Sequence, residues 1–186
     1  MKEDVLDIVI NGVKTKAMLL FIDETDRPIL RKMYDNWKVL NVGMKSLSSR
    51  GVNIPEGISE SAFCLEFNKN CARAIKVFNG SGSFDALDTK TGVRIQVKAC
   101  SVKNELTSFG PKSVWDELYF LDFYREGNYD GTFDVYKIPN ELIYNHKVNA
   151  NQTLKEQQAQ NRRPRFSIKK EIIAKNNLKP IKTCKI

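Results

Sequence analysis

The chain has 186 residues, which suits a single domain that can bury an ordinary core without disulfides or a structural metal. Lysine and arginine outnumber aspartate and glutamate by 30 to 22, so the net charge of +8 favours a polyanionic partner but specifies no chemistry. The four cysteines show no C-x-x-C pairing and the single histidine has no ligand-type neighbour, which argues against zinc and against histidine-centred hydrolysis. Without an apolar signal segment or a long uncharged stretch, a soluble protein of the cytoplasm, with no membrane contact, is expected.

The N-terminal part is predicted to form a hairpin followed by two helices. Residues 5–10 and 16–22 are apolar strands joined around Asn11-Gly12, a pair typical of tight turns. From Arg27 to about Leu47, apolar residues recur at helical spacing behind Pro28, which predicts an amphipathic helix. Its apolar positions are Ile29, Leu30, Met33, Tyr34, Trp37, Leu40 and Met44. A further helix is expected from about Ile58, beginning near a serine cap.

The rest of the chain is predicted to add the strands of a central sheet. Residues 83–88 and 93–102 form a hairpin about the turn TKTG, residues 117–124 and 132–138 form two more strands, and Pro139 opens a short helix. Helical pieces follow near 153–160 and 167–176. This order predicts an α/β (α+β) fold with a mixed central sheet flanked by helices. We expect one domain over 1–186, with a core at about 50–140 that holds the candidate site and a basic region at about 149–186 that suits contact with a polyanion.

Three polar residues of the central hairpin form the candidate catalytic group. Gln96 and Lys98 lie two residues apart on one strand, so they point to the same face, and the turn brings Asp85 beside them. Phosphodiester hydrolysis needs a cation that neutralises the scissile phosphate and lowers the pKa of an attacking water. Asp85 would supply a carboxylate ligand, and Lys98 would orient the water or stabilise the developing charge. Gln96 and the carbonyl of Val97 would add neutral oxygens, which suit Mg²⁺.

The same trio has a plainer interpretation, in which the polar side of a half-exposed strand is simply solvated. The setting favours a site, because apolar-flanked strands and a Gly-rich loop surround the trio and a helix with three glutamates, Glu56, Glu60 and Glu66, precedes it. We expect Glu60 to complete the metal site, since we place it in the first helical turn, where a carboxylate is electrostatically favourable. Helix capping is the alternative role for Glu60.

Longer stretches of the chain, from about Arg50 onward, carry a resemblance to a known family. They are NIPEGISESAFCL, GSFDALD, IQVKA, LTSFGPKSVWDELYFLDFY, DGTFDVYKIPNELIYN and NRRPRFSIKK. Through them the chain resembles the PD-(D/E)XK nucleases, and among these the Type II restriction endonucleases that recognise the interrupted palindrome GCNGC.

The resemblance implies a restriction-endonuclease-like fold, Mg²⁺ as cofactor, double-stranded DNA as substrate and a cognate DNA methyltransferase as functional partner. By position, Asp85 corresponds to the aspartate of the motif, Gln96 to its second acid and Lys98 to its lysine, while Phe84 replaces the proline. The glutamine removes one negative charge from the metal site. A further carboxylate such as Glu60 is then needed, and the number of bound ions stays open.

Two segments are candidates for DNA contact. Residues 161–167 concentrate Arg162, Arg163 and Arg165 around Pro164, and guanidinium groups bind phosphate or the O6 and N7 edge of guanine in bidentate fashion. A solvated basic stretch is the alternative interpretation. Residues 101–113 follow the catalytic strand directly, and their short polar and basic side chains suit phosphate contacts. The residues we single out there are Lys103, Asn104, Ser108 and Lys112.

Three functions remain open at this point. The first is a sequence-specific endonuclease acting as a homodimer, because a palindromic site matches two-fold protein symmetry. The second is a basic nucleic-acid-binding module without catalysis. The third is a repair or structure-specific nuclease with the same site chemistry. Cleavage of plasmid DNA with Mg²⁺ and its loss with EDTA separates the second from the others, and discrete bands separate the first from the third.

Overall fold

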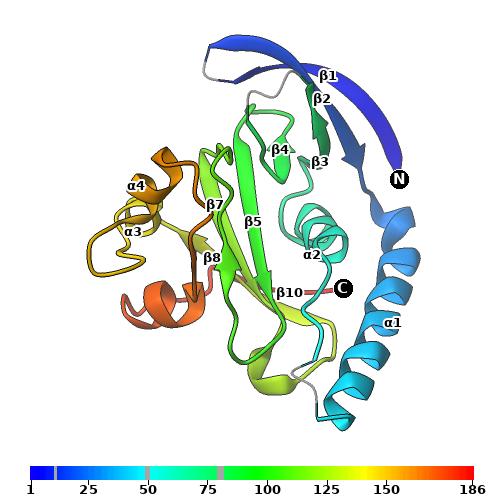
Figure 1. The fold of residues 1–186 in the computed structure, drawn as a ribbon. Coiled ribbons are helices and arrows are strands. Elements are labelled where there is room, and N and C mark those ends of the chain that lie inside the picture. Colours follow the sequence, from blue (N-terminus) through cyan, green and yellow to red (C-terminus); the bar gives the residue numbers. More distant parts are fainter. Residues whose placement is uncertain (11, 49–50, 79–81) are drawn as a thin grey trace.

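The computed structural model describes residues 1–10, 12–48, 51–78 and 82–186 (Figure 1). The strands are β1 (Lys2–Ile10), β2 (Val13–Phe21), β3 (Cys71–Val77), β4 (Ala86–Asp88), β5 (Arg94–Cys100), β6 (Thr107–Ser108), β7 (Glu117–Asp122), β8 (Thr132–Ile138), β9 (Arg165–Phe166) and β10 (Lys182–Lys185). The α-helices are α1 (Arg27–Ser46), α2 (Glu56–Ala62), α3 (Asn140–Tyr144) and α4 (Leu154–Ala159). Short 3-10 turns cover η1 (Glu24–Asp26) and η4 (Arg125–Gly127), and π-helical turns cover η2 (Phe63–Phe67) and η5 (Lys169–Ala174).

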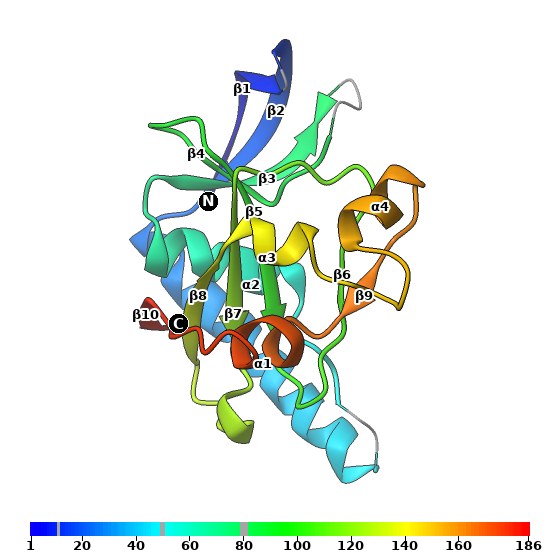
Figure 2. The same cartoon turned by 90° about the vertical axis from the view of Figure 1, so that its left-hand side faces the viewer.

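A mixed sheet organises the molecule. Its strand order is β1-β2-β3-β4-β5-β7-β8-β10, and β5 and β7 run parallel while every other neighbouring pair is antiparallel. The parallel pair needs a crossover, and residues 101–116 make it. Within that crossover, β6 pairs with β9 in a separate two-stranded sheet, and Figure 2 shows the two side by side below α4.

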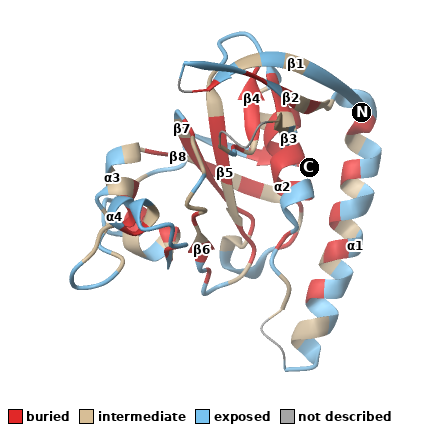
Figure 3. Ribbon diagram, turned by 45° about the horizontal axis from the view of Figure 1, so that its top comes forward, coloured by how far each residue is buried: buried red, intermediate tan, exposed pale blue. Residues whose placement is uncertain are grey.

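Helices cover both faces of the sheet. Figure 1 shows α1 and α2 on one side and α3, α4 and η5 on the other. One core cluster joins α1 and α2 to the sheet through residues such as Tyr34, Phe63 and Phe133. A second cluster joins the C-terminal elements to β7 through residues such as Phe120 and Ile168. Because both faces are covered, β4 and β7 are buried almost throughout, and β5 and β8 are buried over about half of their length, as the red and tan segments of Figure 3 show.

Most predicted elements are confirmed. The N-terminal hairpin, the helix from Arg27, the central hairpin, the strands β7 and β8 and the short helix after Pro139 all form. The predicted turn residue Asn11 lies outside the described residues, and Gly12 has the positive φ of 80° that such a turn needs. All four cysteines are buried and free.

Some expectations were wrong. Helix α2 begins at Glu56, directly after Pro55, and not at a serine cap; Ser59 lies inside the helix and bonds back to the Glu56 carbonyl at 3.2 Å. Glu60 is therefore in the second turn. In α1, only Leu30, Tyr34, Trp37 and Asn41 are buried. The predicted apolar residues Ile29, Met33 and Leu40 are each more than half exposed, at 52%, 51% and 54%.

Strands β3 and β10 were not predicted. Arg73 interrupts the apolar pattern of β3, and β10 lies in a basic segment whose pattern indicates no strand. No helix in the described part of the chain is long and apolar enough to cross a membrane.

Candidate active site

Asp85 sits at the start of the central hairpin, where two neighbouring strands hold its backbone. Its N–H donates to the Ile95 carbonyl at 2.9 Å, and its own carbonyl accepts from the Ala74 N–H at 2.8 Å. Its side-chain Oδ2 accepts from the Val97 N–H at 2.8 Å and from Gln96 Nε2. The carboxylate is therefore fixed in direction before any ligand binds.

Gln96 and Lys98 join Asp85 from the same face of β5, as their spacing predicts. Gln96 is 2% exposed, which contradicts a simply solvated strand face. Its Oε1 is buried and has no hydrogen-bond partner in the described part of the chain. Lys98 Nζ lies 3.9 Å from Asp85 Oδ2 and packs over the ring of Phe109, 5.9 Å from its centroid. The three polar tips thus meet.

Glu60 reaches the same region from α2. Its Oε2 accepts from Arg73 Nε of β3 at 2.5 Å, and the residue is 5% exposed. Burial, followed by the nearby charge of Asp85, raises the pKa of Glu60 to about 8, against the opposing effect of Arg73. Burial also raises the pKa of Asp85, which Lys98 and the Val97 N–H oppose. The carboxylates of Glu60 and Asp85, when both are ionised, repel each other in this buried region, and a bound cation would relieve that repulsion.

The other two glutamates of this segment differ in their placement. Glu56 is exposed in the first turn of α2, and its charge raises the pKa values of both Glu60 and Asp85, so it faces the same region. Glu66 points elsewhere, because it pairs with Arg27. Of the three glutamates, Glu56 and Glu60 are therefore the candidates for a second carboxylate beside Asp85.

The donor set fits a hard divalent cation. In residues 1–10, 12–48, 51–78 and 82–186, no three His, Cys, Asp or Glu side chains are grouped to hold a metal. A site at Asp85 would instead combine carboxylates with neutral oxygens, and the unpaired Gln96 Oε1 is such an oxygen. A buried acceptor without a partner costs about 1–3 kcal/mol, which coordination of a cation would offset. Val97 donates its N–H to Asp85. In an extended strand the N–H and the carbonyl of one residue point to the same side, so the Val97 carbonyl also points toward Asp85.

A cleft of about 890 Å³ opens beside this group. Val97 and Lys98 of β5, Glu56 and Ser59 of α2, and the crossover after β5 line it, whereas Asp85, Gln96 and Glu60 are not among its lining residues. The lining residues of the crossover include Lys103, Asn104 and Ser108, all predicted DNA contacts. The cleft therefore connects the candidate catalytic residues to a predicted DNA-binding segment.

The two predicted DNA-binding segments are joined to each other. Ser108 of β6 lies opposite Arg165 of β9, and the Phe109 N–H donates to the Pro164 carbonyl at 3.0 Å. Pro164 is buried, whereas Arg162, Arg163 and Arg165 are exposed and lie outside the lining of the cleft. Lys112 is exposed, and its carbonyl accepts from the Ser83 N–H at 3.1 Å, close to Asp85 in sequence.

Two residues near the site were missed by the sequence analysis. Arg73 of β3 pairs with Glu60 of α2, and nothing in the sequence of β3, CARAIKV, indicates that partner. Glu105 is buried and accepts from the N–H groups of Ile168 at 2.5 Å and Lys169 at 3.2 Å, so it binds the crossover to η5. A lone acid among polar loop residues carries no local sign of such a role.

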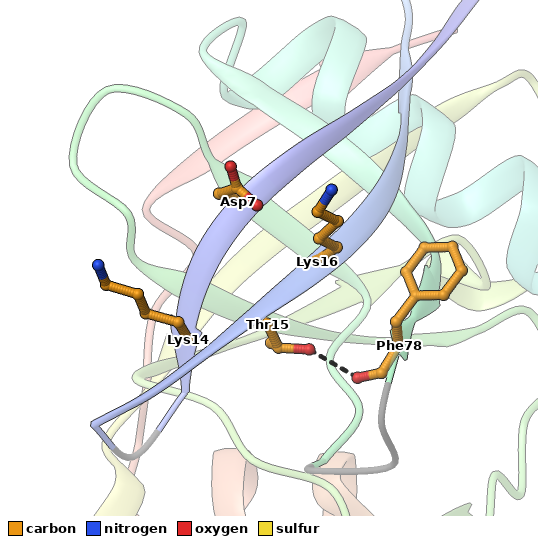
Figure 4. Close-up of a pocket in the computed structure, with 5 residues that line it drawn as sticks. All are labelled: Asp7, Lys14, Thr15, Lys16 and Phe78. Atoms are coloured by element: carbon orange, nitrogen blue, oxygen red, sulfur yellow. Dashed lines mark hydrogen bonds between the residues drawn. The ribbon is translucent and has the colours of Figure 1, made fainter.

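A smaller hollow lies on the N-terminal hairpin. It has a volume of about 370 Å³ and is lined by Asp7, Lys14, Thr15, Lys16 and Phe78 (Figure 4). Thr15 Oγ1 donates to the Phe78 carbonyl at 2.7 Å, which fixes its base. Lys14 and Phe78 lie at opposite ends, so these side chains do not converge on one point. This hollow therefore lacks the grouped side chains that the region around Asp85 has.

Comparisons with known proteins agree on one group of enzymes. A sequence model described as Bsp6I restriction endonuclease matches residues 22–175. The Type II restriction enzyme Bsp6I of Bacillus sp. (strain RFL6) is 39% identical over 153 residues, which cover 81% of this chain and 82% of that enzyme. No solved structure matches the chain. The matched region includes Asp85, Gln96 and Lys98 as well as the arginine segment.

Proposed function

The chain belongs to the Bsp6I restriction endonuclease family and is accordingly a site-specific deoxyribonuclease, and we propose that it hydrolyses double-stranded DNA at a short palindrome with Mg²⁺ as cofactor. The proposed target is GCNGC, and the proposed products carry 5′-phosphates. Residues 1–186 act as one endonuclease domain in a bacterial cytoplasm. A DNA methyltransferase of matching specificity protects the host DNA there.

The observation that carries this proposal is the convergence of Asp85, Gln96 and Lys98 beside the cleft. Hydrolysis needs acids that bind a metal cation, and it needs a base or a positive charge near the attacked phosphate. Side chains that are already in contact meet both requirements. The unpaired Gln96 Oε1 adds the feature that a purely structural cluster would not need.

Asp85, Gln96, the Val97 carbonyl and Glu60 are the proposed metal ligands. When bound, Mg²⁺ would neutralise the scissile phosphate and lower the pKa of a bound water. Lys98, held near Asp85 by β5, orients the attacking water or stabilises the charge of the pentacovalent phosphorus. Arg73 holds the Glu60 carboxylate in place. Glu56 is the alternative acid, because it lies on the cleft wall and acts on the same charges.

The duplex is proposed to lie across the cleft and the β6–β9 ribbon. Lys103, Asn104, Ser108 and Lys112 would contact phosphates from the crossover. Arg162, Arg163 and Arg165 would reach the grooves from the ribbon side, where two-stranded ribbons can enter the major groove. The pairing of Ser108 with Arg165 supports this arrangement, because it makes the two segments one surface.

Digestion of a plasmid of known sequence tests the proposal. We expect discrete fragments with Mg²⁺ and intact plasmid with EDTA, and sequencing of the ends should place every cut within GCNGC. A smear or nicks alone would favour a structure-specific nuclease. Intact plasmid with Mg²⁺ and with Mn²⁺, together with DNA retention in a gel, would favour a non-catalytic binding module.

A further inference from the structure

Leu106 is an apolar residue that the crossover leaves exposed on the lining of the cleft. The residue is 72% exposed, although its neighbours Glu105 and Thr107 are only 6% and 7% exposed. It lies directly before β6 and is one of the residues that line the cleft. Single exposed apolar residues are common on protein surfaces, so this exposure gains meaning only from the way in which Leu106 is held.

Buried anchors on both sides fix the direction of Leu106. On one side, the Glu105 carboxylate accepts from the N–H groups of Ile168 at 2.5 Å and Lys169 at 3.2 Å. On the other side, β6 begins at Thr107 and pairs with β9. The buried, exposed, buried order of residues 105–107 is that of a strand, in which successive side chains point to opposite sides. The fold itself therefore turns Leu106 away from the core.

The other exposed residues of the cleft lining, in the part of the chain that the structure describes, are all polar. They are Asn53, Glu56, Lys103 and Asn104. Such side chains can hydrogen-bond to phosphate oxygens or hold a cation, and a leucine can do neither. The apolar surface of duplex DNA lies on the sugars and on the base edges in the grooves, as at the C5 methyl group of thymine. Leu106 therefore suits a different part of the duplex from its polar neighbours.

We propose that Leu106 packs against a base edge of the duplex that occupies the cleft, and that it thereby contributes to the choice of DNA sequence. Contact with a base removes the leucine side chain from water, which favours binding. The β6–β9 ribbon beside Leu106 also carries Arg165, so an apolar group and a guanidinium group approach the duplex from neighbouring positions. In loose, non-specific binding the phosphates supply the affinity, and Leu106 stays in water.

This contact rests on the proposed function only in requiring that a duplex occupy the cleft. It depends neither on Mg²⁺ nor on GCNGC as the target. The cognate duplex for the test therefore carries the site that mapping of plasmid fragments gives. If the plasmid is not cut, selection of bound duplexes from a random pool supplies the cognate sequence instead.

Binding to cognate and scrambled duplexes in Ca²⁺ across a salt series tests the contact. Leu106→Ala should lower the affinity for the cognate duplex about tenfold, equivalent to about 1.4 kcal/mol. Its affinity for the scrambled duplex should be almost unchanged. The salt slope should also stay as in the wild type, because no contact with phosphate is lost. Lys103→Ala provides the contrast, since loss of a phosphate contact should reduce the slope by about one unit on both duplexes.

Three further variants separate an apolar contact from a general disturbance. Leu106→Met should keep the wild-type affinity because it keeps an apolar side chain, whereas Leu106→Asn should lose as much as Leu106→Ala. Ile181→Ala removes an apolar side chain that is 53% exposed outside the cleft lining, and it should bind both duplexes as the wild type does. All these variants should unfold at the urea concentration of the wild type, since the side chains they replace are exposed.

Several outcomes would overturn the proposal. It fails if Leu106→Ala binds the cognate duplex as the wild type does, if it loses affinity equally on both duplexes, or if it lowers the salt slope. It also fails if Leu106→Asn keeps the wild-type affinity, because the contact would then not be apolar. A chain that prefers no sequence would refute both this contact and the proposed function. A mapped site other than GCNGC would refute only the proposed target, and the binding series on that site would still decide the role of Leu106.

Discussion

At the scale of single residues, Asp85 is the point at which the contacts of the site meet. Two backbone hydrogen bonds hold its main chain, and two donors hold its Oδ2. Lys98 lies 3.9 Å from the same oxygen. The carboxylate and the lysine have different proposed tasks, so their removal should have different consequences.

We predict that Asp85→Ala and Lys98→Ala each lower the cleavage rate about a hundredfold or more while keeping specific DNA binding in Ca²⁺. Asp85→Ala should also weaken binding of Mn²⁺, measured by calorimetry, because it loses a ligand. Lys98→Ala should bind Mn²⁺ as the wild type does. Normal cleavage by either variant would show that the active site lies elsewhere.

The choice between the two glutamates on α2 can be decided by matched variants. Glu60→Gln should slow cleavage and shift its dependence on Mg²⁺ to higher concentration, because a buried ligand loses its charge. Glu56→Gln should cleave at ordinary Mg²⁺ concentrations, and Glu66→Gln serves as a remote control. If Glu56→Gln is inactive and Glu60→Gln is not, the acid in the first turn is the ligand.

Stability without metal should fall as the pH rises. The pKa of Glu60 in the folded protein is about 8, above its ordinary 4.5, so the folded state binds more protons between these values. The resulting stabilisation is complete below the lower value and is lost as the pH passes through the upper one. Urea unfolding in EDTA should show up to about 1 kcal/mol lost per pH unit from pH 5 to 8. An equal slope for Glu60→Gln would exclude Glu60 as its source.

At the scale of elements, the β6–β9 ribbon determines where the arginine segment points. Arg165 lies in β9 opposite Ser108, and the carbonyl of buried Pro164 accepts a hydrogen bond from Phe109. Gln158 Nε2 also donates to the Gly110 carbonyl at 2.7 Å, which ties α4 to the crossover. The arginines are therefore presented from a fixed backbone.

We predict that at least one of Arg162→Ala, Arg163→Ala and Arg165→Ala lowers affinity selectively for the cognate duplex. An arginine bidentate to guanine should cost about 1–3 kcal/mol on the cognate site and almost nothing on a scrambled one. An arginine that contacts only phosphate should weaken both equally and reduce the salt slope by about one unit. Binding to both duplexes across a salt series measures this. Equal losses for all three would move base reading to residues 101–113.

At the scale of the whole molecule, the C-terminal region is part of the core. Ile168, Ile172 and Ile173 pack in the same cluster as Phe120 of β7, and β10 extends the sheet beyond β8. Lys169 pairs with the buried Asp122 of β7. The basic region that was expected to contact DNA therefore also closes one face of the sheet.

We predict that Ile168→Ala, at a fully buried position, lowers the free energy of unfolding by about 2–4 kcal/mol. Ile181→Ala, at a position 53% exposed, should change it by less than about 0.5 kcal/mol. Urea denaturation of the whole chain measures both. An Ile168→Ala variant as stable as the wild type would mean that the C-terminal region is only loosely attached.

The sequence alone determined what depends on neighbours along the chain. The alternation of β5 and the turn before it predicted that Asp85, Gln96 and Lys98 meet, because residues two apart share a strand face and a short hairpin has one register. Helix α1 and the strands β7 and β8 followed from periodicity in the same way. Family resemblance supplied the likeness to restriction endonucleases, which the comparisons confirmed.

Tertiary structure decided whatever depends on residues far apart in the chain. Arg73 meets Glu60, β6 meets β9 and Glu105 caps η5 only after the sheet has formed. Helical periodicity showed that Ile29, Met33 and Leu40 share a stripe, but which side of α1 packs on the sheet depends on the surface that receives it. Tyr34 and Trp37 fill that surface, and Ile29, Met33 and Leu40 face solvent beside them. The helical pattern could not predict this, because it contains no information about the surface against which the helix packs.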